Sequence, residues 1–409
     1  MIIAFSALVI LYCLVLIESV WVLLHGRVKF AEISNAEPQK ANAVSVIMCA
    51  LLPNEEEILL NSVRKVLGEI EFNKKNELIV SIASIESSRV LADLRTLELS
   101  HGQLRVLLSK EIVGKFAQLN SAIKCAQNDL IYLLDADEYP VERVLERACR
   151  QHSRDEIWQG VTLPRNQNVL FEKIVGSETK IKYLVGLQFR ALGGGNVYFC
   201  GSNAIWPRQK LVSLQFNNAS LVEDVEISVR ANLEGHQVHF KPWLIATELA
   251  PSKLTSWWIQ RRRWAKGWLE VGQHHFHDLV VSKRLNWRQK YDWLYLIYLR
   301  RVVLATAWLT YFTSAALVIT FGSINTSDVL FDWALHIVPL QLSVAIIQVA
   351  ATSNTGTRSG LLSKSSVLYV LCFPFYELMK SAVALDAVRL SALGRHEWQV
   401  TPRGMRPKE

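Results

Sequence analysis

Two patterns of hydrophobic and polar residues divide the chain. Four runs are almost free of charge and reach or approach the roughly 20 apolar residues that a membrane helix needs; they are residues 2–24, 302–321, 333–351 and 365–376. Residues 42–250 instead show short β-rich stretches separated by helix-like stretches. The chain is therefore predicted to hold an α/β domain flanked by membrane segments.

The stretch 42–250 predicts alternating strands and helices. Strands of this kind, separated by helices of about 10–15 residues, are typical of βαβ units in a parallel sheet. Ligands of such sheets bind outside the carboxyl ends of the strands, so we expect the functional residues there. The predicted strands are 43–49, 77–82, 103–108 and 129–134, and the predicted helices lie near 55–68, 88–99, 116–127 and 141–151.

The apolar runs predict membrane topology to different degrees. Residues 2–24 carry one charge, Glu18, and basic residues follow them, which favours an uncleaved anchor whose second end is cytoplasmic. The last run, 365–376, is uncharged for only 12 residues. Two interpretations of it stay open: it spans with Glu377 and Lys380 paired inside the protein, or it lies in the membrane interface.

Charge and composition favour a membrane surface as the partner of the basic region. Residues 253–303 hold 11 Lys or Arg and 3 Asp or Glu, and seven of the 13 tryptophans lie between Trp257 and Trp308. Basic residues and Trp beside apolar runs are typical of a lipid headgroup layer, so we expect no nucleic-acid partner. The six cysteines form no C-x-x-C pair, which excludes a zinc ribbon or a thioredoxin-like motif.

The predicted fourth strand ends in two carboxylates. Residues 133–137 read Leu-Leu-Asp-Ala-Asp, so Asp135 and Asp137 point the same way if the strand stays extended. Two such ligands can hold Mg²⁺ or Mn²⁺ and leave positions for water and phosphate oxygens. A solvated turn would explain the pair equally well, so the hypothesis depends on the motifs around it.

Two further pairs of residues support a site at the strand ends. Gly114-Lys115 follows the third predicted strand, where glycine permits close approach of a phosphate and lysine can neutralise it. Glu223-Asp224 opens a helical pattern, where one acid could act as a general base. The plain alternatives are a surface loop for the first pair and helix capping for the second.

A third motif lies in the basic region. Gln260-x-x-Arg263-Trp264 falls in a helical pattern that is rich in Arg and Trp. Arginine can neutralise a pyrophosphate, and tryptophan can stack on the face of a sugar. The alternative is an interfacial helix whose arginines reach towards water.

Taken in order, these motifs resemble the membrane-embedded synthases of glycosyltransferase family 2, which include cellulose, hyaluronan, chitin-oligosaccharide and poly-N-acetylglucosamine synthases. The resemblance extends over about residues 43–403. The Q-x-x-R-W spacing at 260–264 looks like the family signature. The remaining matching segments are Pro53-Asn54-Glu55-Glu56, Leu119-Asn120, Gly201-Ser202-Asn203 and Trp398-x-x-Thr401-x-Arg403.

The resemblance implies an enzyme with an α/β GT-A (Rossmann-like) catalytic domain combined with transmembrane and interfacial α-helices. It implies inverting transfer from a nucleotide sugar, with Asp224 as general base beside Glu223. The implied donor-binding residues are Asn54, Glu55, Lys115, Asp135, Gln260 and Arg263. The implied acceptor-binding residues are Trp264, Gly201 and Ser202, and Asp135 with Asp137 would hold Mg²⁺ or Mn²⁺.

One stretch departs from the family pattern. Residues 81–87 read Ser-Ile-Ala-Ser-Ile-Glu-Ser, and Ile82 or Ala83 stands where the family usually has an acidic residue that contacts the base. Ser84 or Glu86 could replace that contact, or the donor is not a UDP-sugar. We nevertheless expect a UDP-sugar donor and a growing polysaccharide or oligosaccharide as acceptor.

Three alternative functions are weighed against this one. Transfer of a single sugar to a lipid would use the same motifs, and a non-catalytic relative could act as a scaffold. A phosphatase of the haloacid-dehalogenase type also has D-x-D at a strand end. It carries the motif on its first strand with Thr or Val where Tyr139 stands here, which argues against that class.

The expected protein is a multi-pass protein of the cell membrane with a cytoplasmic catalytic domain. Its expected partners are the nucleotide-sugar donor, a carbohydrate or lipid-linked acceptor and membrane lipids, and a homo-oligomer or a small accessory subunit could complete a channel. The predicted segments are a transmembrane anchor (1–25), a GT-A domain (42–250), interfacial helices with the Q-x-x-R-W motif (251–300), a C-terminal transmembrane region (301–390) and a basic tail (391–409).

Overall fold

We describe the chain from a computed structural model that covers residues 2–26, 41–83, 88–109, 114–153, 155–217, 220–299, 326–353 and 363–394. The chain forms two compact units. The sheet unit holds the described residues within 30–167 and 196–251, and the helical unit holds those within 1–29, 168–195 and 252–401. Residues 168–195 thus pack with the helices, although they lie inside the range predicted for the GT-A domain.

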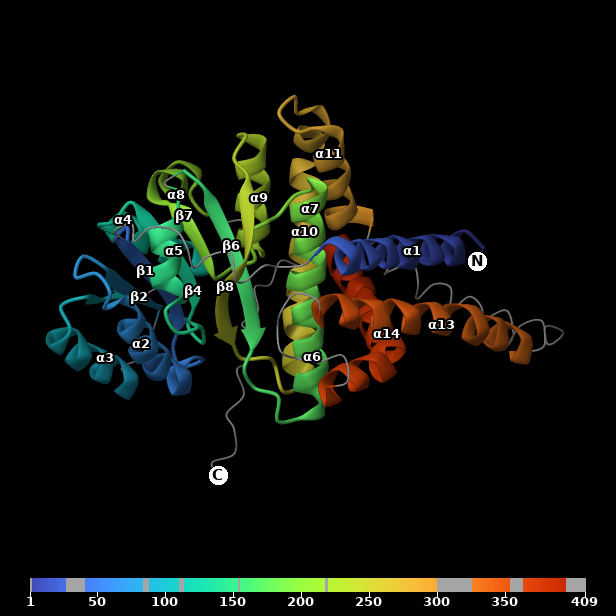
Figure 1. The fold of residues 1–409 in the computed structure, drawn as a ribbon, viewed down its shortest axis with the longest axis horizontal. Coiled ribbons are helices and arrows are strands. Elements are labelled where there is room, and N and C mark those ends of the chain that lie inside the picture. Colours follow the sequence, from blue (N-terminus) through green and yellow to red (C-terminus); the bar gives the residue numbers. More distant parts are fainter. Residues whose placement is uncertain are drawn as a thin grey trace. The chain divides into compact units, whose positions relative to one another are not determined.

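An eight-stranded sheet with the order β3-β2-β1-β4-β7-β6-β8-β5 is the centre of the sheet unit (Figure 1). Strands β1 to β4 are parallel to one another and lie within two residues of the predicted limits. The strands are β1 (Val44–Leu51), β2 (Glu77–Ala83), β3 (Leu104–Ser109), β4 (Leu130–Asp135), β5 (Tyr139–Pro140), β6 (Ile157–Pro164), β7 (Ala204–Pro207) and β8 (Val238–Glu248).

The prediction of a parallel sheet is wrong beyond β4. β7 runs antiparallel to β4, and β5 runs antiparallel to β8, so the sheet is mixed. The reason is topological: the chain leaves the sheet after β6 and returns through β7 in the opposite direction between β4 and β6. Short or polar strands such as β7 carry too little hydrophobic pattern to reveal this return.

The order of the parallel strands creates a crevice at one point of the sheet. From β1 the chain moves outward to β2 and β3, and it then returns to place β4 on the other side of β1. The connections at the carboxyl ends of β1 and β4 therefore diverge, and ligands of open α/β sheets bind at such a switch point. The D-x-D motif at the end of β4 lies there.

Helices cover both faces of the sheet, with α2 and α3 on one side and α4 and α8 on the other (Figure 1). Side chains alternate along a strand, so Val46 and Met48 of β1 face α2, where Leu59 and Val63 are fully buried against them. The covering helices are α2 (Glu56–Ile70), α3 (Arg89–Ser100), α4 (Lys115–Cys125), α5 (Val144–Gln151), α8 (Arg208–Leu214) and α9 (Glu223–Leu233).

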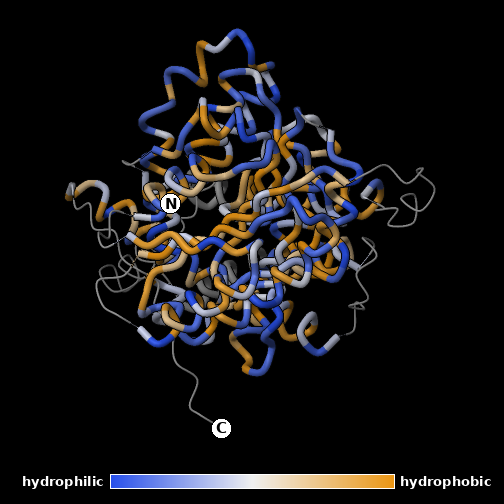
Figure 2. The backbone as a smooth tube through the Cα atoms, turned by 90° about the vertical axis from the view of Figure 1, so that its left-hand side faces the viewer, coloured by the Kyte–Doolittle hydropathy of each residue, from blue (hydrophilic) through white to orange (hydrophobic). Residues whose placement is uncertain are grey.

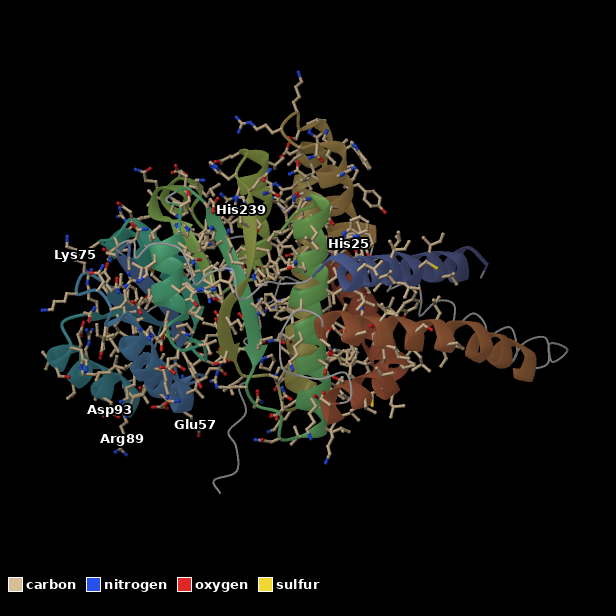
Figure 3. The ribbon with its side chains drawn as sticks, viewed as in Figure 1. His25, Glu57, Lys75, Arg89, Asp93 and His239 are labelled. Atoms are coloured by element: carbon tan, nitrogen blue, oxygen red, sulfur yellow. The ribbon has the colours of Figure 1, made fainter. Side chains whose placement is uncertain are left out.

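Hydrophobic and charged residues separate as this layering requires. Hydrophobic residues run along the strands in the middle of the unit (Figure 2). Glu57 of α2 and Arg89 of α3 instead point away from the sheet (Figure 3). The amphipathic patterns that predicted these helices thus correspond to one buried and one solvated face.

The helical unit contains the apolar runs that the structure describes. α6, η1 and α7 follow one another without a break, and η1 is a π-helical turn. The helices are α1 (Ile2–His25), α6 (Leu170–Ile181), η1 (Lys182–Leu187), α7 (Gln188–Gly193), α10 (Leu254–Val281), α11 (Trp287–Leu294), η2 (Tyr295–Leu299), α13 (Thr326–Ser353) and α14 (Lys364–Ala392).

Among the described helices, α14 has the length and apolar composition needed to cross a membrane. Shorter apolar helical stretches occur at Val9–His25 and Val338–Ser353. The predicted run 302–321 and the tail from residue 395 lie outside the described residues. The crossings therefore stay predictions.

The Glu377 and Lys380 side chains of α14 pair inside the helical unit. Glu377 is 6% exposed, and Lys380 also lies 3.7 Å from a carboxylate oxygen of Glu178 on α6. Glu178 accepts hydrogen bonds from Arg261 of α10 (2.7 Å) and from the Tyr376 hydroxyl (2.8 Å). The charges that interrupt the last apolar run are thus met by protein groups, as one of the two open interpretations requires.

Candidate active site

Lys115 is the centre of the charged group at the carboxyl end of β4. Gly114, with φ of 120° in the region that favours glycine, is the residue before α4, and Lys115 is the first residue of that helix. The Lys115 ammonium donates to the Asp135 carboxylate at 2.6 Å and to the Gly201 carbonyl at 3.2 Å. It also lies 3.5 Å from the Glu223 carboxylate. One cation thus joins the end of β4, the loop before β7 and the start of α9.

Asp224 lies beside the same loop. Gly201 has φ of 96°, and a Cβ atom built on it would lie 3.3 Å from Asp224 Oδ2. Asp224 is the second residue of α9, and its carbonyl accepts a hydrogen bond from Ser228 Oγ at 2.6 Å. The structure therefore brings together five residues that the sequence predicts: Lys115, Asp135, Gly201, Glu223 and Asp224.

The second carboxylate of the D-x-D pair lies in a different environment from the first. β4 ends at Asp135, so the strand does not stay extended to Asp137, which is the condition for both side chains to point the same way. The Asp135 side chain is 33% exposed, whereas Asp137 is 2% exposed. Asp137 Oδ2 accepts a hydrogen bond from the Leu249 N–H at 3.0 Å, and Arg165 donates to the Asp137 carbonyl at 2.6 Å.

Glu138 adds a third acid to this end of β4. It is 1% exposed, accepts a hydrogen bond from Ser202 Oγ at 2.7 Å and accepts one from the Asp135 N–H at 3.3 Å. Burial raises the pKa of Glu138 well above its usual range, and the charges of Asp135, Glu248 and Asp137 raise it further. Acidic groups are therefore gathered at this point of the sheet, and Glu138 is held in its neutral form.

The pKa of Lys115 reflects its neighbours. Burial by itself would lower the pKa of the ammonium, but Asp135 and Glu223 together raise it above its ordinary value. The side chain is therefore a permanent cation between two carboxylates. Cys49, which is opposite Asp135 in the β1–β4 register, is buried, and burial raises the pKa of its thiol to about 12. The thiol is thus neutral and packs as an apolar group.

The loop after β1 is fixed by its own acid. Glu55 is 9% exposed and accepts hydrogen bonds from the Leu51 N–H at 2.7 Å and from the Asn54 side chain at 2.6 Å. These bonds tie the first turn before α2 to the last residue of β1. Asn54 and Glu55 therefore stand at the switch point of the sheet, joined to each other and to the end of β1.

The Q-x-x-R-W residues belong to α10 in the helical unit. Gln260, Arg263 and Trp264 are partly exposed there. The Arg261 guanidinium lies 4.6 Å from the centre of the Trp264 ring and pairs with Glu178. Arg261, which lies inside the motif, thus has a structural partner.

Residues 45–213 match the family described as glycosyl transferase family 2. Residues 130–348 match the description glycosyl transferase family group 2, and this match alone extends over more than half of the chain. The chain is a family 2 glycosyltransferase. This membership confirms the resemblance that its motifs showed.

Proteins similar in sequence to this chain include a polysaccharide synthase and a probable glycosyltransferase. A poly-β-1,6-N-acetyl-D-glucosamine synthase of Staphylococcus aureus (strain COL) is 27% identical over 237 residues, which are 56% of this chain and 56% of that protein. A probable glycosyltransferase of Bacillus subtilis (strain 168) is 24% identical over 237 residues, 55% of this chain and 54% of its own length. The glycosyltransferase thus aligns with little more than half the length of these relatives.

A solved structure has the same fold. The mannosyltransferase from Pyrobaculum calidifontis, determined in complex with GDP-Man and Mn²⁺, superposes with a TM-score of 0.57 over 87% of this chain and 96% of its own. At 18% sequence identity the likeness shows the fold alone. The predicted GT-A, Rossmann-like class of the sheet unit is confirmed.

Sequence reasoning missed several polar residues that support the site. Glu138 directly follows the D-x-D pair, and its burial could not be read from a stretch that looked like a turn. Gln159 is fully buried on β6, which the pattern did not reveal as a strand, and it accepts a hydrogen bond from the Cys200 N–H at 2.8 Å. Their signal was a polar residue inside an apolar stretch, and that signal is weak without knowledge of the neighbouring loop.

Proposed function

We propose that this glycosyltransferase is membrane-bound and inverting, and that it moves a sugar from a nucleotide-sugar donor to a growing polysaccharide or oligosaccharide. The observation that carries the proposal is the grouping of Lys115, Asp135, Glu223 and Asp224 at the switch point of a GT-A sheet. The donor diphosphate needs positive charge and a metal site, and the acceptor hydroxyl needs a base. In this group Lys115 is the candidate cation, Asp135 a candidate metal ligand and Asp224 the candidate base.

Asp224 is the proposed general base. In the reaction its carboxylate takes the proton of the acceptor hydroxyl, and the acceptor oxygen forms a bond to the anomeric carbon from the side opposite the leaving group. The bond between that carbon and the diphosphate oxygen breaks, the nucleoside diphosphate leaves, and the configuration inverts. Glu223 is the first residue of α9, and its carboxylate lies 3.5 Å from the Lys115 ammonium. We assign it the role of holding the start of α9, and with it Asp224, at the site.

Asp135 and Asp137 are the proposed ligands of a divalent cation. The described residues contain no group of three or more His, Cys, Asp or Glu side chains arranged to hold a metal by themselves. The donor set nevertheless fits Mg²⁺ or Mn²⁺, because these ions take few protein carboxylates and complete their shell with water and phosphate oxygens. The carboxyl groups of Asp135, Asp137 and Glu138 gather at this end of β4, which also favours a cation. When bound, the metal would neutralise charge on the leaving diphosphate.

Further donor and acceptor contacts follow from the family resemblance. We assign Asn54, Glu55 and Lys115 to the donor side, and Gly201 and Ser202 to the acceptor side. Gln260 and Arg263 are assigned to the diphosphate and Trp264 to the acceptor sugar. The assignments on α10 rest on the Q-x-x-R-W motif.

The donor is proposed to be a UDP-sugar. A relative named as a poly-β-1,6-N-acetyl-D-glucosamine synthase makes UDP-N-acetylglucosamine the first donor to test. The fold neighbour was determined with GDP-Man, so a GDP-sugar is the matched alternative. Ile82 and Ala83 end β2 without an acid, and Ser84 and Glu86 lie outside the described residues. The base contact is therefore the part of the donor site that the test must decide.

Membrane attachment is proposed from the apolar helices. α14 meets the requirement for a span, and its internal charges are paired within protein. We propose the predicted multi-pass arrangement in the cell membrane with the sheet unit in the cytoplasm.

Product analysis tests the proposal. The full chain in detergent is given one donor, Mg²⁺ or Mn²⁺ and a short oligosaccharide acceptor, and the products are measured by mass spectrometry and by NMR of the new anomeric centre. A ladder of products with inverted configuration supports the proposal. Retained configuration contradicts the in-line step, and a single addition to a lipid acceptor in place of a ladder contradicts polymer extension.

A further inference from the structure

The loop at residues 199–203 contacts three parts of the proposed active site in the sheet unit: the cation, the base and the buried acid. Its Gly201 carbonyl accepts from Lys115, and its Gly201 Cα faces Asp224. Its Ser202 hydroxyl donates to Glu138. A displacement of this loop would therefore move the base, the cation and the buried acid relative to one another.

One buried side chain on the opposite strand holds this loop by its backbone. Gln159 of β6 is fully buried, and its Oε1 accepts from the Cys200 N–H at 2.8 Å. Its Nε2 lies within hydrogen-bond distance of the Ser202 carbonyl (3.1 Å) and the Asn203 carbonyl (3.3 Å). A carboxamide supplies a donor and an acceptor on neighbouring atoms, and both ends of the loop use them.

The strand is irregular at the point where Gln159 reaches the loop. The β6–β8 register shifts between Gln159 and Val161, and the Gly160 N–H between them donates to the Asn203 carbonyl at 2.9 Å. An irregularity of this kind redirects a side chain and is frequent beside active sites. Asn203 itself is fully buried with φ of 49°, and its side chain donates to the Val161 and Leu244 carbonyls.

The same loop is tied to the base helix from its other end. The Phe199 N–H donates to Ser228 Oγ at 2.9 Å, and that hydroxyl donates to the Asp224 carbonyl at 2.6 Å. Gln159 is thus connected to the main chain of Asp224, the residue proposed as base. The connection runs through the Cys200 N–H, the loop backbone, the Phe199 N–H and the Ser228 hydroxyl.

We infer that Gln159 is a positioning residue for the transfer step, acting through the 199–203 loop on Asp224. The inference rests on the proposed role of Asp224 as base. Loss of the carboxamide leaves the loop backbone groups without their partner, and the loop relaxes away from the geometry that aims Asp224. Gln159 is fully buried and acts through the loop, so kcat should fall by more than the donor KM changes.

The test replaces Gln159 by Met, which has a similar shape and makes none of these hydrogen bonds. The matched control is Asn76→Leu: Asn76 is also a buried amide that joins backbone groups, the Val44 N–H and the Ile70 carbonyl, but at the amino end of the strands. Turnover and donor KM are measured by nucleoside diphosphate release from the full chain in detergent, and folding is measured by the thermal midpoint.

Both variants are expected to lower the midpoint, but only Gln159→Met should lower kcat, by about 10- to 100-fold for a displacement approaching 1 Å. An unchanged kcat in Gln159→Met overturns the inference, and so does an equal loss of kcat in Asn76→Leu. If Gln159→Met does not fold, Ser228→Ala removes the link at the other end of the loop. The same fall in kcat is expected there, and unchanged turnover overturns the inference.

Asp224→Asn separates this inference from the proposed function. If Asp224→Asn retains full turnover, Asp224 is not the base, and the proposed function fails whatever Gln159→Met does. If Asp224→Asn is inactive while Gln159→Met turns over normally, the proposed base stands and the inference about Gln159 alone is overturned.

Discussion

Replacing Gly201 by alanine tests whether the 199–203 loop sets the position of the Asp224 carboxylate. The backbone φ of 96° is one that residues with a side chain rarely adopt, and holding alanine there costs about 1–3 kcal/mol. The new methyl group would lie 3.3 Å from Asp224 Oδ2, which is tighter than ordinary contact, and 3.7 Å from its Cγ. The carboxylate must therefore move by a few tenths of an ångström.

The expected catalytic loss follows from that displacement. Misplacement by 1 Å can cost about 100-fold in rate, so a few tenths of an ångström corresponds to roughly 3- to 10-fold in kcat. Stability should fall by the backbone strain alone. Donor affinity should stay unchanged, because the methyl group meets the base and not the Asp135 side of the site.

The assay is nucleoside diphosphate release at saturating donor and acceptor, together with the thermal midpoint of each variant. Gly194→Ala is the matched control, because Gly194 has φ of 70° but a Cβ atom there would meet no atom within 4 Å. It should lose stability and keep its kcat. A Gly201→Ala enzyme with unchanged kcat, or one that loses only donor affinity, would refute the placement of Asp224 as base.

Three other changes have defined outcomes. Lys115→Met removes the cation between two carboxylates and should lower kcat/KM for the donor by about 10- to 100-fold, measured in the same release assay; a loss below twofold would contradict its role. Glu178→Gln removes the charged partner of the partly buried Arg261 guanidinium and should lower the free energy of unfolding by about 2 kcal/mol, seen as a thermal midpoint several degrees lower. An unchanged midpoint would show that the pair is not stabilising. Burial lowers the pKa of His152 from 6.5 to about 4 in the folded protein. Between these pH values the unfolded chain binds more protons at His152 than the folded protein does. The free energy of unfolding therefore rises with pH in this range, by up to about 3 kcal/mol. His152→Phe should therefore gain stability relative to the wild type as the pH falls from 7 to 5, and a pH-independent difference would contradict the neutral buried state.

Local patterns were enough to predict the first half of the sheet unit. β1 to β4 and the helices between them are amphipathic or apolar in the manner that their burial requires, so their limits could be predicted closely from the sequence. The carboxyl end of β4 could be chosen as the site for the same reason, because topology brings strand ends together at one edge.

The remaining features depend on contacts between distant segments. β7 has four residues, and β6 contains the buried polar residues Gln159 and Thr162, so neither has the hydrophobic pattern of a strand. The return of the chain between β4 and β6 is a consequence of pairing that no local pattern encodes. The packing of residues 168–195 with the helical unit is non-local in the same sense.

The roles of neighbouring acids were also beyond local reasoning. Asp135 and Asp137 are equivalent in the motif, but the end of β4 between them leaves one partly exposed and buries the other under the Leu249 N–H. Lys115 was predicted near donor phosphates from a Gly-Lys pair alone. Its contact with Glu223 depends on the approach of α9, which is more than 100 residues away in the chain.

Nucleoside diphosphate release by the full chain and by Asp224→Asn tests the central claim most directly. The purified proteins in detergent are given UDP-N-acetylglucosamine, other UDP-sugars and GDP-mannose in turn, with Mg²⁺ or Mn²⁺ and an oligosaccharide acceptor. We expect release from one donor by the wild type, and its loss in Asp224→Asn and in the presence of a chelator. Equal release by Asp224→Asn would contradict the claim that this carboxylate is the base of the transfer.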